Sequence, residues 1–409
     1  MLVTSCVEEI PLEIESFESV LIVEATITNT NKQQEILLSR SYRFDSIPVQ
    51  ESNATVIVTD DAMNTYTFSE TTSGKYVSQT VFSAQPERNY SLSITTFNGK
   101  KYASNEMKLT QPTLIDNLYV EGDFNENGIE GASIYVDSYD PTGNSKYYRH
   151  EYEETYKIIS PLYSTEELLS NGIEFPILQE DQPDWESLQD LIDFLVTIQS
   201  RTEQEQICYN TINSNNLNLI STTDFGEDRL NKYRVRFLGK GNSEIRHRYS
   251  ILVRQFVQSR EAYVFYETLS SFAQSENVFS ENQPGFLEGN IFSVNHNETI
   301  FGFFEVASVD EKRLFFNFED VFPNQSFPPH FVDCDEYYTP ALIRESLDQS
   351  HMWINSPLVD AINSGFQFYE ENNENFSSPL GPGPFNLVLG PCGDCTFLGN
   401  NNVPDFWED

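Results

Sequence analysis

The sequence predicts a mainly β protein, in which an N-terminal immunoglobulin-like β-sandwich precedes a larger β-rich domain with helical insertions. Three observations support this fold class. Short β-type runs separated by turn residues fill the first hundred residues, two stretches show helical periodicity, and 31 Phe and 21 Tyr supply apolar side chains for the cores. Because 409 residues exceed what one compact core usually holds, we expect two or three domains.

The first predicted domain spans residues 18–112. Its β-type runs cover 20–27, 54–59, 66–68 and 90–97, and Asn98-Gly99 is a strong signal for a two-residue hairpin. About seven short β runs within this length are typical of an immunoglobulin-like sandwich, which usually presents or spaces another domain. Gln111-Pro112-Thr113 marks the expected boundary.

The second predicted domain spans residues 113–409 and contains two helices. Apolar residues recur at helical spacing over 184–199, behind Pro183-Asp184, and again over 260–273, where Ser259 is the expected N-cap. Strands are expected around these helices, over 231–238, 246–257, 290–294, 300–307, 313–318 and 385–389. Both apolar helix faces are expected to pack into the core.

The net charge of −39, from 24 Lys and Arg against 63 Asp and Glu, limits the partners that the protein can have. It argues against nucleic acid, because the phosphates would be repelled. No apolar run approaches the length of about 18 residues that a membrane-spanning helix requires. We therefore expect a solvated, acidic protein.

Residues 1–17 predict a lipobox and a short tether. Val3-Thr4-Ser5-Cys6 has the pattern that bacterial lipoprotein signal peptidase cuts before, which makes Cys6 the expected site of lipidation. Acyl chains contribute about 0.8 kcal/mol per buried methylene, so a multiply acylated Cys6 would hold a soluble domain on a membrane. The alternative is an ordinary leader with a free Cys.

The other four cysteines are an even number and suit two disulfides in an oxidising compartment. They are Cys208, Cys334, Cys392 and Cys395, and three connectivities are open to them. Cys392 and Cys395 also have the spacing of half a zinc site, but no second such pair and no nearby His completes four ligands. We therefore favour disulfides over zinc.

Two further patterns are candidate binding sites. Asp123, Asn125 and Asn127, followed by Gly128, reproduce the first half of a calcium loop, although Ile134 stands where the distal Glu of an EF-hand would be. A polar hairpin turn without metal is the favoured interpretation, so no cofactor is expected beyond this calcium candidate.

The second pattern is a basic strip, within which Arg234 and Arg236 are expected to share one face of a strand. The strip could bind an anionic ligand, a lipid head group or an acidic partner, but neutralisation by the chain's own carboxylates is favoured. Its members are Arg234, Arg236, Arg246, Arg248 and Arg254.

The sequence contains no recognisable catalytic motif. Nucleophile elbow, HExxH, Walker and dinucleotide-binding patterns are absent, and the five His residues are scattered without metal-ligand spacing. We therefore do not expect an enzyme.

Several stretches together resemble a known family. They are 140–149 with 151–155, 249–255, 262–263 with 265–266, 289–291, 302–308, and the closing Cys392-Gly393-Asp394-Cys395 with Pro404-Asp405-Phe406-Trp407. These are similar to a Bacteroidota outer-membrane lipoprotein family of uncharacterised function, often encoded beside TonB-dependent transporters. The resemblance runs from about residue 18 to the end of the chain.

The resemblance implies lipidation at Cys6 and a position on the outer membrane. Exposure at the cell surface is expected, because Glu8-Glu9 just after Cys6 is similar to the surface-export signals of such lipoproteins. It implies a role similar to that of the lid lipoproteins of glycan importers, as an accessory to a TonB-dependent transporter in substrate capture or gating. The alternatives are a stand-alone surface binding or adhesion protein and a glycan-degrading enzyme. The small-molecule or glycan ligand stays open.

Overall fold

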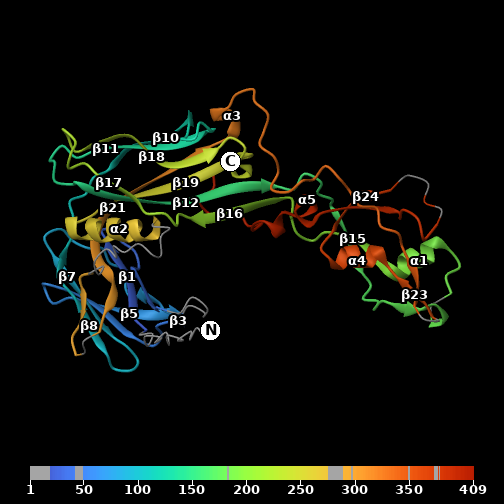
Figure 1. The fold of residues 1–409 in the computed structure, drawn as a ribbon, viewed down its shortest axis with the longest axis horizontal. Coiled ribbons are helices and arrows are strands. Elements are labelled where there is room, and N and C mark those ends of the chain that lie inside the picture. Colours follow the sequence, from blue (N-terminus) through green and yellow to red (C-terminus); the bar gives the residue numbers. More distant parts are fainter. Residues whose placement is uncertain are drawn as a thin grey trace, which may run out of the picture.

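A computed structural model describes residues 19–41, 49–181, 184–274, 289–295, 298–348, 351–372, 376 and 378–409. The mainly β fold is confirmed, since strands form most of the regular structure. Two β modules lie one above the other, and a lobe extends from them to one side (Figure 1). The lipidation candidate Cys6 lies outside the described residues.

The first module is one sheet that curls around its own core. Its strands follow the order β21-β1-β2-β6-β5-β4-β7-β8-β20, with β3 beside β2 and β9 beside β7. The bounds are β1 Leu21–Thr28, β2 Glu35–Arg40, β3 Val49–Gln50, β4 Thr55–Asp60, β5 Thr65–Thr72, β6 Lys75–Ser78, β7 Asn89–Thr95, β8 Lys101–Ser104, β9 Met107–Lys108, β20 Ile291–Ser293 and β21 Ile300–Phe316.

Alternation along β1 shows how this core forms. Leu21, Val23, Ala25 and Ile27 are buried in the core, whereas the residues between them lie on the other face of the sheet. The Asn290 side chain closes the curl, because its Nδ2 donates to the Phe304 carbonyl and its Oδ1 accepts from the Phe304 N–H. Strands from residues 291–307 therefore complete a module that the sequence placed within 18–112. The immunoglobulin-like arrangement stays a prediction.

The second module packs two sheets against each other. The sheet β10-β11-β18 covers the strands β16-β12-β19-β21, with β17 beside β12, and the apolar core lies between them. The bounds are β10 Ile115–Phe124, β11 Glu130–Tyr139, β12 Tyr147–Ile159, β16 Ile207–Asn213, β17 Asn218–Ser221, β18 Arg229–Gly239 and β19 Tyr249–Val257, with α2 Arg260–Gln274, α3 Phe318–Val321 and the short η2 Ser243–Ile245.

One strand, β21, joins the two modules. Residues 300–307 pair in parallel with β1, and residues 308–316 pair antiparallel with β19. The two strands expected over 300–307 and 313–318 are thus one continuous strand. Gly302 is required within it, because its φ is +143° and a Cβ would lie 2.1 Å from the Val23 carbonyl oxygen.

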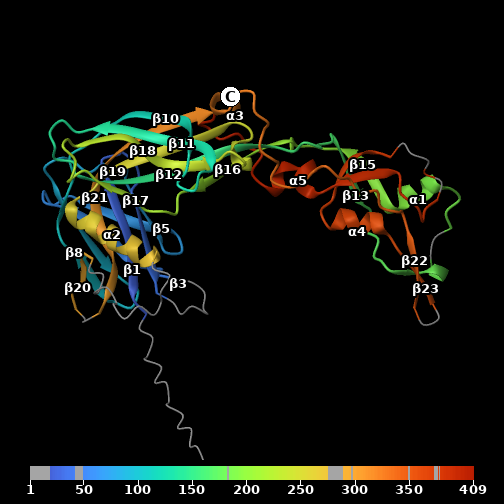
Figure 2. The ribbon, with the colours of Figure 1, turned by 45° about the horizontal axis from the view of Figure 1, so that its top comes forward.

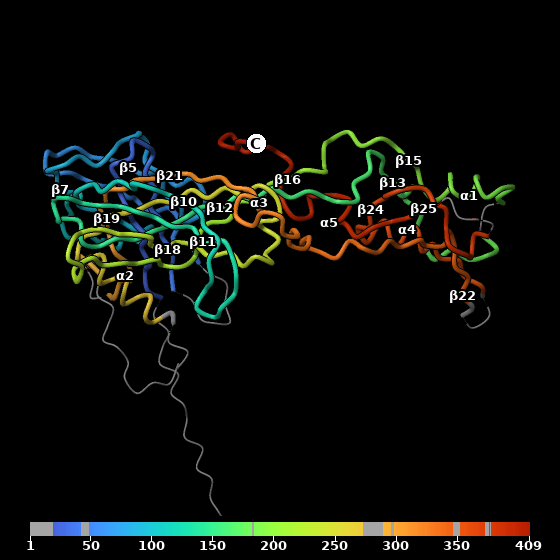
Figure 3. The backbone as a smooth tube through the Cα atoms, turned by 90° about the horizontal axis from the view of Figure 1, so that it is seen from above, coloured from blue at the N-terminus to red at the C-terminus, as the bar shows by residue number. Residues whose placement is uncertain are grey.

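The lobe consists of residues 161–206 and 335–398 and has its own small apolar core. Its elements are β13 Glu166–Ser170, β14 Ile177–Leu178, η1 Gln179–Asp181, α1 Leu188–Leu195, β15 Val196–Ser200, β22 Arg344–Asp348, β23 His351–Asn355, α4 Pro357–Asn363, β24 Gln367–Glu371, β25 Phe385–Val388, α5 Gly390–Gly393 and η3 Cys395–Phe397. Seen from above, the lobe continues the long axis of the molecule (Figure 3).

The helix predicted over 184–199 is present but shorter, so both predicted ends are wrong. The helix α1 begins after Ser187, whose side chain accepts from Asp190 N–H in a capping box, and it ends at Leu195. The next residues, Val196 to Ile198, include three β-branched side chains and pair with β13 instead. By contrast, α2 follows Ser259 as expected, and the Ser259 Oγ accepts from Ala262 N–H at 3.1 Å.

Candidate functional site

A groove of about 620 Å³ lies where the two modules meet. Its floor is the outer face of β1, with Ile22, Glu24 and Thr26, and of β21, with Phe301 and Phe303. Further lining residues come from β2, α2, β12, β19 and neighbouring loops: Lys32, Glu35, Leu37, Arg149, Glu151, Asn215, Leu217, Phe256, Phe265, Tyr266 and Leu269.

Helix α2 forms one wall because its apolar face packs on β21. Phe265 packs against Phe303 with the rings tilted by 38° and 5.4 Å between their centroids, and it belongs with Phe303 to a small apolar cluster. The next residue, Tyr266, and Leu269, one turn after Phe265, also line the groove. Figure 2 shows α2 across the first module, directly beneath the second. The wall is therefore largely apolar.

Arg149 of β12 lies at the back of the groove and is only 5% exposed. Its guanidinium donates to Glu305 at 2.8 Å and also to Glu151. The guanidinium carbon lies 4.4 Å from the centroid of the Phe256 ring and 4.9 Å from that of Tyr266. Its Nε has no acceptor among the described residues.

Burial is the largest single influence on the pKa of Arg149 and would lower it, but the charges of Glu305 and Glu151, the nearby Tyr266 and the hydrogen bond to Glu305 together raise that pKa. Glu305 is 1% exposed and accepts a further hydrogen bond from Gln258 Nε2 at 2.9 Å. The charge of Arg149 is thus retained in the interior by a carboxylate that is itself held in place.

The open side of the groove is acidic. Glu24 is exposed, and Glu151 keeps 38% of its side chain exposed. Glu35 is also exposed and pairs with Lys75 at 3.0 Å, while Lys32 adds one positive charge at the rim. The groove therefore combines an apolar wall, a buried Arg and an acidic rim.

Four cysteines lie in the neck, the set of chain segments around Cys208, Cys334, Cys392 and Cys395 that join the second module to the lobe. Cys208 of β16 pairs with Cys395, and Cys334 pairs with Cys392 of α5. The two cysteines of the Cys392–Cys395 motif thus have different partners. Gly393 between them packs closely, since a Cβ there would lie 2.6 Å from the Gln367 Cβ.

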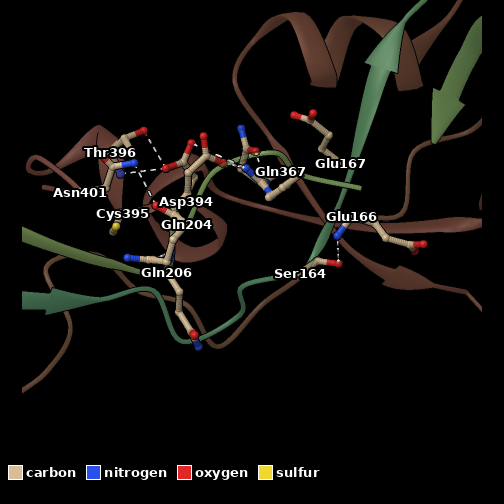
Figure 4. Close-up of polar contacts among 12 residues, drawn as sticks. Ser164, Glu166, Glu167, Gln204, Gln206, Gln367, Asp394, Cys395, Thr396 and Asn401 are labelled. Carbon is tan, nitrogen blue, oxygen red and sulfur yellow. Dashed lines mark hydrogen bonds and ion pairs between the residues drawn. The ribbon is translucent and has the colours of Figure 1, made fainter. Parts of the chain in front are cut away.

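A polar cluster lies beside Cys395 (Figure 4). The Arg201 side chain, 4% exposed, donates to Glu205 and to Gln367 Oε1, and it lies 4.0 Å from Asp394 Oδ2. The Asp394 Oδ1 accepts from both the N–H and the hydroxyl of Thr396. The Asp of the motif therefore fixes the turn after α5 and faces a buried guanidinium.

The closing Pro404-Asp405-Phe406-Trp407 segment packs back on the second module. The Phe406 ring lies 3.6 Å from the Arg313 guanidinium carbon, and Trp407 contacts the rings of Tyr209 and Phe315. This motif is thus part of the packing around β16 and β21.

The calcium candidate is the turn of the β10–β11 hairpin. Asn125 Oδ1 accepts from Asn127 N–H at 3.0 Å and from Ile129 N–H at 2.9 Å, and Asp123 bonds Tyr135 OH. These side-chain oxygens therefore accept hydrogen bonds from groups of the hairpin itself. Within the described ranges, no cluster of three His, Cys, Asp or Glu side chains is placed to hold a metal ion.

The basic strip does not form one surface. A register shift in the pairing of β11 with β18 places Arg236 opposite Ile134 and Arg234 opposite Tyr135, so the two arginines point to opposite faces and the expected shared face is wrong. Arg236 makes two 2.9 Å bonds to Glu154, which is buried.

The remaining members of the strip differ in their partners. Arg254 lies between Glu153 and Glu311, at 3.7 Å and 3.4 Å. Arg234, Arg246 and Arg248 instead donate to backbone carbonyls, those of Phe124, Pro328 and Glu408. Carboxylates of the chain thus neutralise Arg236 and Arg254.

Sequence reasoning missed Arg149 and Glu305. A signal was present, because Glu305 is the one charged residue in the apolar run 300–307 that was expected to be a strand. Arg149 stands in one of the stretches that carry the family resemblance.

The fold and groove define a mainly β protein of two modules with an intermodule groove and a disulfide-linked lobe. The chain belongs to the family described as a domain of unknown function, DUF4249, whose model matches residues 7–313. The Cys392–Cys395 motif and the Trp407 segment lie beyond the matched residues. No curated protein matches the chain. No helix in the described part of the chain is long and apolar enough to cross a membrane.

Proposed function

We propose that this protein is a bacterial outer-membrane lipoprotein, anchored through Cys6 and exposed at the cell surface, that captures a small ligand for a TonB-dependent transporter. The groove carries the proposal. Its volume falls in the range of about 300–1,000 Å³ that ligand pockets occupy, and such pockets favour the junctions between domains. The sequence resemblance supports the anchor and the transporter.

Binding without catalysis is the role that we propose for the groove. Arg149 and Glu305 bond to each other, and Gln258 holds the second oxygen of Glu305. A pair fixed in this way suits a rigid wall that positions a ligand, whereas acid–base catalysis uses a group that exchanges protons with substrate. The aromatic wall suits an apolar part of the ligand.

The two disulfides support a place outside the cytoplasm. Disulfides form and persist in oxidising compartments and are rare where thiols are kept reduced. Here both lie in the neck, where they connect the segments that carry the lobe. An exported protein meets the conditions under which both bonds form.

Filling the groove tests ligand capture. Leu37 lines the groove and is 41% exposed, while Leu169 of the lobe is 40% exposed and serves as the matched control. In thermal-shift screens of metal chelates, oligosaccharides and short peptides, we expect a hit that stabilises wild type and Leu169→Trp but not Leu37→Trp. Equal stabilisation of both variants would place the ligand elsewhere.

The anchor and the partner are tested in cells. Labelled palmitate should mark the wild type but not Cys6→Ala, and a pull-down from detergent-solubilised outer membranes should recover a large transporter barrel. An unlabelled wild type in the cytosol would contradict the localisation. Recovery of the labelled protein without a barrel would favour the stand-alone binding protein.

A further inference from the structure

Strand β15 is an edge strand whose outer side has no neighbouring strand in the described structure. It pairs only with β13 in a two-stranded sheet. In Figure 3, β15 lies on the outer side of the lobe, with β13 between it and β24. Its five residues, Val196 to Ser200, carry no charge and no Pro. Charged residues and Pro are the residues that usually protect natural edge strands from pairing with another chain, and β15 has neither.

The hydrogen-bond register shows which backbone groups face outward. Arg201 N–H donates to the Thr165 carbonyl and Asn171 N–H to the Leu195 carbonyl, at the two ends of the ladder. Because bonded pairs alternate in an antiparallel ladder, Thr197 and Gln199 bond β13 as well. Ile198 and Ser200 therefore direct their N–H and C=O groups away from β13, and no described residue bonds them.

The edge strand β16, which also lies near the neck, is covered by another segment of the chain. Tyr209 of β16 exchanges two backbone bonds with Asn400, both 2.8 Å long, so the C-terminal segment covers that edge. In addition, Cys208 beside it is fixed by its disulfide to Cys395. The contrast shows that β15 is left open on a molecule that covers a neighbouring edge.

The charge of the lobe limits what can pair with this edge. Residues 161–206 and 335–398 contain twenty Asp and Glu but two basic residues, Arg201 and Arg344. Arg201 is buried in the neck, so Arg344 is the basic residue that the lobe exposes. Glu166 and Glu167 lie on β13, directly beside β15. An approaching strand therefore meets an acidic surface.

We propose that β15 docks an extended basic segment of a partner protein by β-augmentation. The backbone of Ile198 and Ser200 would continue the ladder, and basic side chains of the segment would face the acidic lobe. An apolar residue of the segment would cover Ile198, which is 38% exposed. This inference does not depend on ligand capture in the groove.

A synthetic heptapeptide that alternates Lys and Val is the probe, and fluorescence anisotropy measures its binding to the full chain. We expect binding that weakens with added salt, and at least tenfold weaker binding of the same peptide N-methylated at its three central residues. That control keeps the charge but cannot pair along either edge. A Glu-Val heptapeptide should not bind. Equal binding of the N-methylated peptide, or no binding of the Lys-Val peptide, would overturn the proposal.

Ile198→Pro removes the outward N–H without touching the bonds to β13, because Pro is tolerated where a strand N–H faces solvent. We expect it to weaken peptide binding at least tenfold, whereas Ile198→Ala keeps the backbone and should weaken it less. As a second measurement on wild type, the peptide should slow hydrogen exchange of the Ile198 and Ser200 amides. Unchanged exchange at these amides on the bound protein would overturn the proposed site.

Discussion

Arg149 Nη2 and Glu305 Oε2 lie 2.8 Å apart at the place where β21 passes from one module to the other. Arg149 belongs to the second module, and Glu305 lies opposite Thr26 of the first. The pair therefore joins the two modules behind the groove. Because both side chains are buried, each depends on the other for its charge to be tolerated in the interior.

Glu305→Gln should lower the free energy of unfolding by about 3 kcal/mol, because it leaves the Arg149 charge buried without its main counter-ion. Urea denaturation, followed by tryptophan fluorescence and circular dichroism, measures the loss. Glu151→Gln is the matched control, since Glu151 also bonds Arg149 but is 38% exposed at its side chain. A loss for Glu305→Gln no greater than that of the control would contradict the interior role of the pair.

Replacing both members of the pair should cost less than removing one. Arg149→Met/Glu305→Met removes both charges of this pair, and apolar replacement of a buried pair is often neutral or stabilising. The double-mutant cycle with each single Met variant should give a coupling energy of at least about 2 kcal/mol. Additive single effects would show that the two side chains act independently.

The sequence allowed the fold class and helix α2 to be predicted because both depend on local patterns. The alternation in β1 and the Ser259 cap are examples, whereas the register shift at Val235 is invisible in the alternation of the Arg residues around it. The groove could not be predicted at all. It requires Arg149 and Glu305, which are 156 residues apart, and it depends on one strand serving two modules.

His150 should make the protein less stable in mild acid. The ring is completely buried and bonds Gln255 at 3.1 Å; burial lowers its pKa to about 4, against 6.5 for an ordinary His. A folded-state pKa below that of the unfolded chain means that the unfolded state binds the proton first as pH falls. The His150 contribution to stability is therefore unchanged above pH 6.5 and decreases between pH 6.5 and pH 4.

Between pH 7 and pH 5, this group should account for a stability loss of about 2 kcal/mol. His150→Gln removes the proton-binding site, so its urea midpoint should fall less steeply over that range than that of the wild type. The pKa of His247 is also lowered to about 4, by burial first and by nearby positive charges. His247→Gln should therefore flatten the curve further. Parallel curves for wild type and His150→Gln would contradict this account.

The disulfides of the neck should control access to Arg201. Within residues 161–206 and 335–398, trypsin can cut only after Arg201 and Arg344. The Arg201 side chain is buried beside Asp394, the residue before Cys395, whereas Arg344 is exposed on β22. Cys208→Ser/Cys395→Ser removes the link between β16 and the segment after α5, at an expected cost of about 2–5 kcal/mol in stability.

Limited trypsin digestion under native conditions, followed by mass spectrometry, should show cleavage after Arg201 at least tenfold faster in the variant. Cleavage after Arg344 serves as the internal control and should keep its rate, because that site does not depend on the neck. If cleavage after Arg201 stayed as slow as in the wild type, the disulfide would not be what keeps the neck closed.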